Sequence, residues 1–365
     1  MIEIDVERLR SMGLTPAMAA EAISFASSYL PETAIPGAQL MRLTEVHRET
    51  VELHDGDRPH GARVLPRLVR MLDDDETGLA VGDWVIAALD AHGQRWVHAR
   101  VPPLTHIARR DADGRRHPVV SNVDTAFLVM GLDDDFNPRR LERYLLLVQG
   151  SGVQPVVVLT KADAVPPQAL DNARAQLRGR LPAQVELLAV NGRSAEAAQA
   201  LQPWLSAGQT VVLMGSSGAG KSTLTNTLAG ADLQDTGAVR EHDSRGKHTT
   251  TSRSLHRLPG GACVIDTPGL RTLRPDTDEA RLALGFEDIA TLSLQCRFRD
   301  CRHEEEPGCA VREGVGVDRV RNYHKLLREV RRDTLTVLER HQQLSQWKAR
   351  GRLARERMKL KRGED

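Results

Sequence analysis

The chain has 365 residues, of which 40% are apolar and 27% are charged, and its formal net charge is +1. This length exceeds one ordinary domain core, so we expect two or three packed units. No apolar run is long enough to cross a bilayer, and the first ten residues, MIEIDVERLR, lack the apolar stretch of a secretory signal. Composition therefore argues against membrane-embedded and secreted classes and favours a cytoplasmic protein.

The residue pattern changes three times along the chain, which predicts four regions. Residues 1–35 carry helical signals, with Thr15 placed to cap a helix that starts at Pro16. Residues 36–110 contain five short β-rich runs, MRLTEVH, TVELHD, ARVLPRLV, GDWVIAAL and RWVHARV. Five strands at this spacing predict a small barrel of the oligonucleotide-binding (OB) type, although a fragment of a β-sandwich would give the same pattern.

Residues 111–285 alternate helix-like segments with the apolar runs AFLVM, PVVVLT, VELLAV, TVVLMG and ACVID. Such runs are typical of strands buried on both faces, so we predict a doubly wound α/β domain. Residues 286–365 hold a cysteine cluster and a charged helical stretch, which predicts a mostly helical C-terminal domain. From Lys348 to Arg362 there are eight Lys or Arg residues and one acid. This tail is either a solvated helix end or a contact to a polyanion.

A phosphate-binding loop (P-loop) follows the strand TVVLMG directly. Its residues are Gly215, Ser216, Ser217, Gly218, Ala219, Gly220, Lys221 and Ser222, with Thr223 next in the helix-like TLTNTLAG. The glycines let backbone N–H groups turn towards phosphate oxygens, and the helix N-terminus adds its positive dipole end. We expect Lys221 to reach the β and γ phosphates and Ser222 to ligate Mg²⁺. An ordinary glycine-rich turn is a weak alternative in this strand-loop-helix context.

Two further segments complete the phosphate end of the predicted site. The strand ACVID runs into Asp266-Thr267-Pro268-Gly269, which has the form of a Mg²⁺-holding aspartate followed by a glycine that senses the γ phosphate. Before it, GKHTTT at residues 246–251 supplies a threonine that can close on Mg²⁺. We favour Thr250, although the pattern alone does not decide among the three threonines.

Base selection is predicted from two strand ends. PVVVLT delivers Thr160, Lys161, Ala162 and Asp163, which resemble the Asn-Lys-x-Asp guanine motif of GTPases. Asp163 would accept hydrogen bonds from the ring N–H and the exocyclic amine, a donor pair that guanine has and adenine lacks. Thr160 replaces the asparagine of the motif, which puts the strength of guanine binding in question.

A second base-contacting loop is predicted by position at the end of the strand VELLAV, where Ala189, Val190 and Asn191 stand without the usual Ser-Ala pair. Both guanine segments precede the P-loop, whereas ordinary GTPases carry them after the Asp-x-x-Gly motif. The predicted GTPase domain is therefore circularly permuted. Such a permutation preserves the site where the original termini lay close together.

Three of the four cysteines lie close together with a histidine. Cys296, Cys301, His303 and Cys309 follow the spacing Cys-x4-Cys-x-His-x5-Cys, and Cys263 lies alone in an apolar strand. Three thiolates and one imidazole make a closed tetrahedral zinc site of the structural type. We predict one zinc ion per chain. Small buried cysteines with an incidental histidine are the alternative.

These features together resemble the ribosome small-subunit-dependent GTPase A family of bacteria. The resemblance extends to local strings such as GDWV at residues 82–85, NVDT at 122–125 and FNPRRLERY at 136–144. It implies a late-acting factor in assembly of the small ribosomal subunit, with a GTPase that is weak alone and stimulated by that subunit. The barrel, the zinc region and the basic tail would then contact ribosomal RNA, and we expect a monomer that uses magnesium with GTP.

The water-orienting residue of hydrolysis is not obvious. Leu270 follows the Asp-x-x-Gly motif, at the position where GTPases of the Ras type carry a glutamine. Our hypothesis is that His248 helps to position or deprotonate the attacking water; an ordinary surface histidine is the competing interpretation. Two other function classes stay open: a P-loop NTPase of metal delivery, and an RNA-binding scaffold that holds GTP without turnover.

Overall fold

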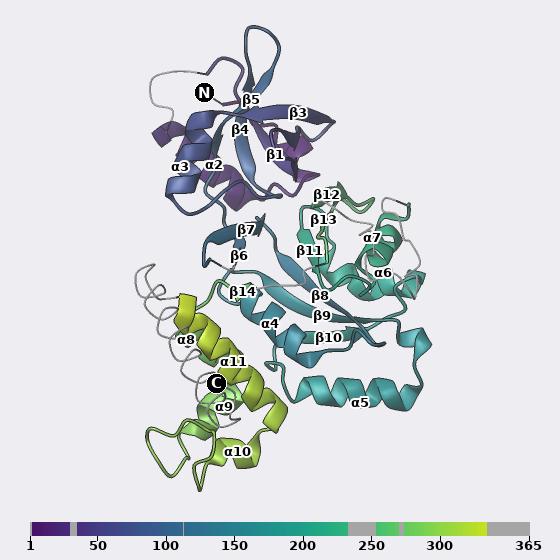
Figure 1. The fold of residues 1–365 in the computed structure, drawn as a ribbon. Helices are drawn as coiled ribbons and strands as arrows, with labels where there is room; N and C mark the ends of the chain where they lie inside the picture. Colours follow the sequence, from purple (N-terminus) through teal and green to yellow (C-terminus); the bar gives the residue numbers. More distant parts are fainter. Residues whose placement is uncertain (1, 30–34, 112, 233–252, 270–273, 334–365) are drawn as a thin grey trace, which may run out of the picture. The chain divides into compact units, whose positions relative to one another are not determined.

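The computed structural model describes residues 2–29, 35–111, 113–232, 253–269 and 274–333 (Figure 1). The chain forms two compact units, Met1–Asp276 and Thr277–Asp365. The first contains two N-terminal helices, a β-barrel and an α/β domain, and the second is helical. Within the described residues, no helix is long and apolar enough to cross a membrane. The four-region division of the sequence stays a prediction.

The N-terminal helices are α1 (Val6–Arg10) and α2 (Pro16–Tyr29). The side chain of Asp5 caps α1 by accepting a hydrogen bond from the Arg8 N–H. Thr15 caps α2 as predicted, because its Oγ1 accepts from the Met18 N–H at 3.2 Å.

Five strands close into a barrel: β1 (Gln39–Val46), β2 (Val51–His54), β3 (Pro59–Val64), β4 (Trp84–Leu89) and β5 (Arg95–Arg100). Neighbours follow the order β1-β2-β3-β5-β4, and β4 pairs back with β1. Only β3 and β5 run parallel. A closed five-stranded barrel of this order confirms the OB-type prediction and excludes the sandwich fragment. Leu43, Leu53 and Val97 are fully buried in its core.

One part of the barrel differs from the sequence-based expectation. The run ARVLPRLV was predicted as a strand throughout, but β3 ends at Val64 and α3 spans Pro66–Asp74. Proline at the first helical position suits a helix start, since its fixed φ and missing N–H cost nothing there. Leu68 and Leu72, four residues apart, bury one face of the helix.

The α/β domain is built on six strands in the order β10-β9-β8-β11-β13-β12. They are β8 (Thr125–Gly131), β9 (Gln154–Thr160), β10 (Glu186–Ala189), β11 (Thr210–Met214), β12 (Ser254–Arg257) and β13 (Cys263–Asp266). The first five in this order run parallel, and only β12 is antiparallel to its neighbour β13. The central strands β8 and β11 are buried along their whole length, as their continuous apolar runs predict.

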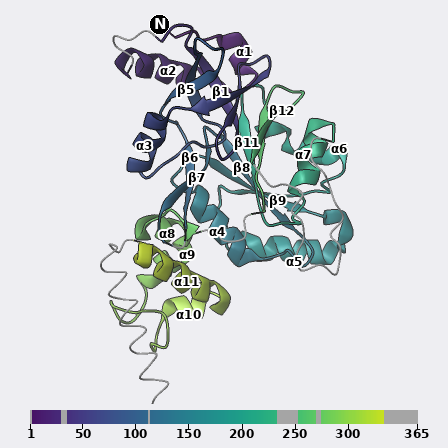
Figure 2. The same cartoon turned by 45° about the horizontal axis from the view of Figure 1, so that its top comes forward.

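Helices cover both faces of this sheet (Figure 1, Figure 2). On one face lie α4 (Pro138–Val148) and α5 (Pro167–Arg178), and on the other α6 (Ala195–Leu201) and α7 (Lys221–Ala229). Alternate strand residues separate the two cores: Leu128 packs in the core that includes Leu145 of α4, and Phe127 in the core that includes Leu224 of α7. Short 3₁₀ turns, η1 (Ala162–Ala164) and η2 (Gln202–Trp204), complete the domain.

A small antiparallel sheet is built on a hairpin that lies between the barrel and the α/β domain in the sequence, with a third strand from the end of the α/β domain. It consists of β6 (His106–Arg110), β7 (Arg116–Ser121) and the distant β14 (Arg274–Pro275). The carboxylate of Asp276 pairs with Arg110 at 2.8 Å and with Arg116 at 2.7 Å. These ion pairs hold the end of the first unit against the hairpin.

The second unit contains α8 (Glu279–Gly285), α9 (Glu287–Ser293), α10 (Ala310–Gly314) and α11 (Val317–Asp333). Arg319 of α11 forms a two-pronged ion pair with Asp288 of α9, at 2.6 and 2.8 Å, and lies over the ring of Phe286. Phe286 in turn meets Tyr323 edge to face. Within residues 277–333, the described part of this unit, the predicted mostly helical character is confirmed.

Candidate nucleotide site and metal centre

The predicted nucleotide residues lie in loops at one edge of the α/β sheet. Parallel strands β8, β9, β10, β11 and β13 all point their carboxyl ends at this edge. Residues 160–163 end and follow β9, residues 189–191 end and follow β10, residues 215–223 follow β11, and residues 266–269 end and follow β13. The sheet thus brings together segments that are more than one hundred residues apart in the chain.

The P-loop has the tight backbone that phosphate binding requires. Gly218 and Gly220 have φ values of 81° and 93°, and Gly220 caps the N-terminus of α7. A Cβ on Gly215 would lie 2.4 Å from the Val129 carbonyl oxygen of β8. A Cβ on Gly269 would lie 2.4 Å from the Ser217 N, so the backbone of the Asp-x-x-Gly segment lies directly against the P-loop. A tight glycine turn that leads into a helix N-terminus is the arrangement that phosphate-binding loops use.

Lys221 is buried beneath the loop. Its side chain is 6% exposed, and Nζ donates a hydrogen bond to the Ser216 carbonyl oxygen at 2.9 Å. Burial lowers the pKa of Lys221, while the charges of Asp266 and Asp135 act in the opposite direction. A lysine held in this way is a fixed positive charge at the base of an anion-binding loop.

Ser222 and Asp266 form an oxygen pair suited to a hard divalent cation. The Ser222 Oγ donates to Asp266 Oδ2 at 3.3 Å. Asp266 is fully buried, and its Oδ1 has no hydrogen-bond partner among the described residues. Burial raises the pKa of Asp266, against the opposing effects of Lys221 and Ser222. A buried carboxylate oxygen without a partner beside a hydroxyl fits Mg²⁺, which takes oxygen ligands.

The two predicted base-reading loops are adjacent. The Ala162 N–H donates to the Val190 carbonyl oxygen at 3.3 Å, and the Val190 N–H donates to Leu159 at 2.8 Å. Asp163 lies exposed in η1, where a ligand can reach its carboxylate. Asn191 is half-buried, and its Oδ1 accepts from the Arg193 N–H at 3.0 Å.

Hydrogen bonds link the base-reading loops to the phosphate end. Thr160 is 1% exposed, and its hydroxyl donates to the Ala219 carbonyl oxygen of the P-loop at 2.6 Å. The Thr227 hydroxyl of α7 donates to the Gly192 carbonyl oxygen at 2.7 Å. The threonine that replaces the motif asparagine thus still bonds a neighbouring loop.

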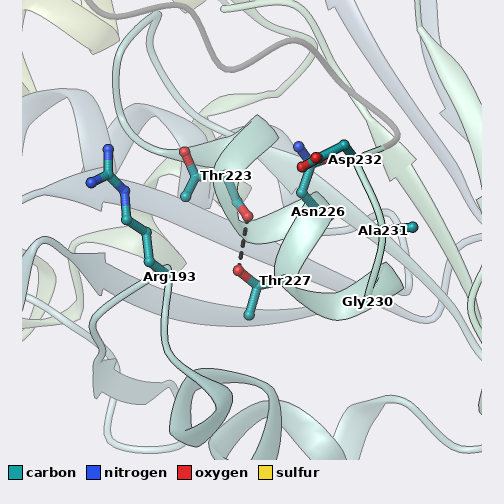
Figure 3. A pocket seen from close by; sticks show the side chains of 7 residues that line it. All are labelled: Arg193, Thr223, Asn226, Thr227, Gly230, Ala231 and Asp232. Carbon is teal, nitrogen blue, oxygen red and sulfur yellow. Dashed lines mark hydrogen bonds between the residues drawn. The ribbon is translucent and has the colours of Figure 1, made fainter.

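A cavity of about 430 Å³ lies beside α7 (Figure 3). Its lining consists of Arg193, Thr223, Asn226, Thr227, Gly230, Ala231 and Asp232. Figure 3 shows the Arg193 side chain on one side, from the loop after β10, and Asn226 and Asp232 on the other. Of these residues only Thr223 belongs to the predicted site. Arg193 was missed because a lone loop arginine carries no motif, although its place two residues after Asn191 was a usable signal.

Four potential metal ligands meet in the second unit. The ligand atoms of Cys296, Cys301, His303 and Cys309 all lie within 4.8 Å of one another. The sulfur atoms of Cys296 and Cys309 are 3.9 Å apart, and His303 Nδ1 lies 3.6 and 3.4 Å from them. Zinc–sulfur bonds of about 2.3 Å in a tetrahedron would separate the ligand atoms by about 3.8 Å. The donor set and its spacing therefore fit a closed metal site.

Some predicted residues fall outside the described part of the chain. His248 and Thr250 lie in the segment 233–252, and Leu270 and the basic tail at 348–362 lie in other such segments. Their roles stay predictions from sequence.

The geometry can be compared with known proteins. The RsgA GTPase family model matches residues 101–275. Proteins named small ribosomal subunit biogenesis GTPase RsgA, from Xanthomonas campestris pv. campestris strain B100 and Xanthomonas axonopodis pv. citri strain 306, are each 48% identical to this chain over 307 residues. That match covers 81% of this chain and 82% of theirs.

Two solved structures share the fold. YjeQ from Thermotoga maritima matches with a TM-score of 0.56 at 20% identity and covers 80% of this chain and 98% of its own. YloQ, described as a circularly permuted GTPase, matches with a TM-score of 0.54 at 21% identity, over 82% of this chain and 98% of its own. The circular permutation inferred from motif order is thereby confirmed at the level of the fold.

Proposed function

Since the chain belongs to the RsgA GTPase family and is a GTP hydrolase, we propose that it assists late maturation of the small ribosomal subunit, which stimulates its hydrolysis of GTP. The observation that carries this proposal is the 48% identity, over four-fifths of both chains, to proteins named for that role. We further propose a cytoplasmic monomer that binds GTP and releases GDP, with the barrel, the zinc region and the basic tail in contact with ribosomal RNA.

The sheet edge supplies the binding half of the mechanism. Phosphoryl transfer needs positioning and charge stabilisation more than covalent chemistry. The P-loop N–H groups and Lys221 would hold the β and γ phosphates, and Asp163 would read the guanine edge. Ser222 and Asp266 would hold Mg²⁺, which supplies charge neutralisation at the phosphates. Buried Lys221 and Asp266 are fixed before any ligand arrives, so they need little reorganisation when the reaction occurs.

The remaining parts of the mechanism come from segments outside the described residues. We propose that Thr250 closes on Mg²⁺ when the γ phosphate is present and that His248 orients or deprotonates the attacking water. The position after Gly269 is Leu270, whose side chain can do neither. Stimulation by the small subunit would follow if contact with the subunit brings His248 to the attacking water.

The Cys/His cluster is proposed to bind one structural zinc ion. Four protein ligands close the coordination shell and leave no position for a reacting molecule. This role is a stabilising one, and it argues against delivery of metal to another protein, which would need an open or labile site.

One hydrolysis assay tests the proposed function. GTP turnover is measured with purified small subunits, with large subunits and with no ribosomal particle. We expect stimulation by the small subunit alone. Equal rates in all three reactions would contradict the proposal, while no turnover in any of them would favour a scaffold that only holds GTP.

Base recognition is tested separately by Asp163→Asn. Loss of the two carboxylate bonds should remove most of the preference for GDP over ADP, because a polar site rejects a ligand that leaves it unpaired. Asp171→Asn is the matched control, since Asp171 is an exposed carboxylate on the neighbouring helix α5. Preference that survives in Asp163→Asn would exclude this residue as the guanine reader.

The role of His248 is tested by single-turnover kinetics of His248→Ala on the small subunit. We expect the stimulated rate to fall about 10²–10⁴-fold, the usual contribution of a positioned acid or base. An unchanged stimulated rate would make His248 a bystander.

A further inference from the structure

The loop between β8 and α4, residues 132–137, carries three consecutive aspartates and was assigned no role from its sequence. We call it the acidic loop. It leaves the sheet from β8, which lies between the P-loop strand β11 and the guanine-motif strand β9. The acidic loop is therefore placed between the two halves of the nucleotide site.

Asp135 is bonded to the P-loop. Its Oδ1 accepts hydrogen bonds from the Ser216 hydroxyl and from Arg140 Nη2, and its Oδ2 accepts from the Gly131 N–H at 3.1 Å. The Asp135 side chain is 12% exposed. Both carboxylate oxygens thus accept hydrogen bonds, and these bonds hold the Asp135 side chain against the P-loop.

Asp133 is bonded to the guanine segment. Its Oδ2 accepts from Lys161 Nζ, and its Oδ1 accepts from the Asp135 N–H at 3.3 Å. Lys161 has a left-handed backbone, φ 61°, which only a well-supported non-glycine residue adopts. Burial tends to raise the pKa of Asp133, but the bond from Lys161 and the Asp135 amide outweigh it, and the pKa is lowered. The carboxylate is therefore charged and paired at neutral pH.

We propose that the acidic loop is a positioning element for GTP binding and hydrolysis, in which Asp135 fixes the P-loop through Ser216 and Asp133 fixes the guanine segment through Lys161. The proposal rests on the assignment of this edge as the nucleotide site. Two carboxylates separated by one residue join the phosphate end to the base end. A ligand that spans both ends then meets a single prearranged unit, which reduces the cost of ordering on binding.

Charge supports a positioning role over direct contact. A carboxylate beside a phosphate-binding loop repels the ligand by Coulomb interaction. Arg140, on the first turn of α4, pairs with Asp135 and offsets that charge. Asp135 therefore contributes through the hydrogen bonds that it accepts, and its net charge contributes little to the field at the phosphates.

The main test is GDP binding by the isolated full chain, followed with a fluorescent GDP analogue. Asp135→Ala should raise the Kd for GDP by about ten- to a hundredfold, as expected for loss of a hydrogen bond to a charged group. KM for GTP should rise with it, while kcat falls less. Asp134→Ala is the matched control: Asp134 is an exposed aspartate of the same loop, and we expect wild-type binding.

Three further variants separate positioning from mere folding. Asp135→Asn keeps an oxygen acceptor for Ser216 and should recover part of the lost affinity at an unchanged melting temperature. Ser216→Ala should weaken binding by itself, and adding it to Asp135→Ala should cost little more, because both changes remove one contact. If Asp135→Ala does not fold, Ser216→Ala alone carries the test.

The contact between Asp133 and the guanine segment is tested by a different measurement, the preference for GDP over ADP. Asp133→Ala should reduce the preference for GDP over ADP more than Asp135→Ala does, because it releases the segment that holds Asp163. Wild-type GDP affinity in Ser216→Ala, or equal behaviour of Asp135→Ala and Asp134→Ala, would overturn the proposal. Failure of the wild-type chain to bind GDP would instead refute the nucleotide site itself.

Discussion

The nucleotide edge and the Cys/His cluster are assembled in opposite ways. The nucleotide edge draws residues from the ends of four strands, β9, β10, β11 and β13, and from the acidic loop after β8. A sheet covered on both faces holds them in place. The cluster takes all four ligands from the segment between Cys296 and Cys309, which contains no strand and no helix. The first site should therefore persist without its ligand, while the second should depend on its ion.

Burial around the two sites agrees with this contrast. Around the P-loop, Leu213, Met214 and Leu224 are fully buried. Near the cluster, Leu294 is 87% and Phe298 is 42% exposed. A segment with so little apolar burial cannot offset its own conformational entropy, and metal–ligand bonds are the usual substitute in such small regions.

Metal removal should produce the largest effect. Structural zinc contributes about 10 kcal/mol or more of apparent folding free energy in small zinc domains. Chelation, or Cys301→Ser, should abolish hydrogen-exchange protection across residues 296–315 and leave GDP binding at the sheet edge intact. Exchange measured by mass spectrometry checks this, with zinc re-addition as the control and metal analysis for one zinc per chain. Unchanged hydrogen-exchange protection after complete metal loss would show that the cluster segment does not depend on its ion.

Lys221→Ala tests whether the buried lysine at the nucleotide edge contributes to GTP hydrolysis. Loss of this buried charge should lower kcat/KM for GTP about 10²–10³-fold, the cost of removing one fixed electrostatic group from a transition state. The exposed Lys325 of α11 supplies the control variant, Lys325→Ala, which should hydrolyse GTP at the wild-type rate. Steady-state kinetics with melting curves distinguish lost catalysis from lost folding. A fall of less than threefold would mean that the lysine does not serve the phosphates.

The same contrast explains what the sequence could predict. The P-loop and the cluster could be predicted because each is a short run whose residues would share one ligand. The barrel and the parallel sheet followed from strand-length apolar runs. Asp133 and Asp135 belong to no motif. Each bonds a residue of another loop, Lys161 and Ser216 respectively, and only the strand order shows which loops meet. The helix α3 was missed for the opposite reason, since a local proline signal was read as part of a strand.

Acid should act on the first unit through His106. Burial, with help from Arg116 and Arg100 and against Asp276, lowers the pKa of His106 from 6.5 to about 4. Its Nδ1 bonds the Ser121 hydroxyl at 2.8 Å. Between pH 6.5 and 4 the unfolded chain binds a proton that the folded chain does not, so stability falls as pH falls through this window, by up to about 3 kcal/mol.

The matched variant for this pH effect is His106→Gln, which keeps a polar group beside Ser121 and cannot titrate. Denaturant unfolding of the first unit at pH 7, 5.5 and 4 should show a smaller acid loss in the variant than in the wild type. Parallel pH dependence of the two proteins would assign acid sensitivity to other groups. Because this effect needs no metal, it should be the same before and after chelation. The acid effect on the first unit can then be told apart from the metal effect on the Cys/His cluster.

Thr160 should give the smallest effect, because it makes one link within a site that has many. Thr160→Val keeps the shape but leaves the Ala219 carbonyl without its donor, so GDP should bind about three- to tenfold more weakly, the range of one neutral hydrogen bond. Thr160→Ser keeps the hydroxyl and serves as the control. The hydroxyl has one proton, and Ala219 takes it. Thr160→Asn adds a second donor, so tighter GDP binding by that variant would show that the threonine limits guanine affinity. Wild-type GDP binding by Thr160→Val would show that the hydrogen bond to Ala219 is dispensable.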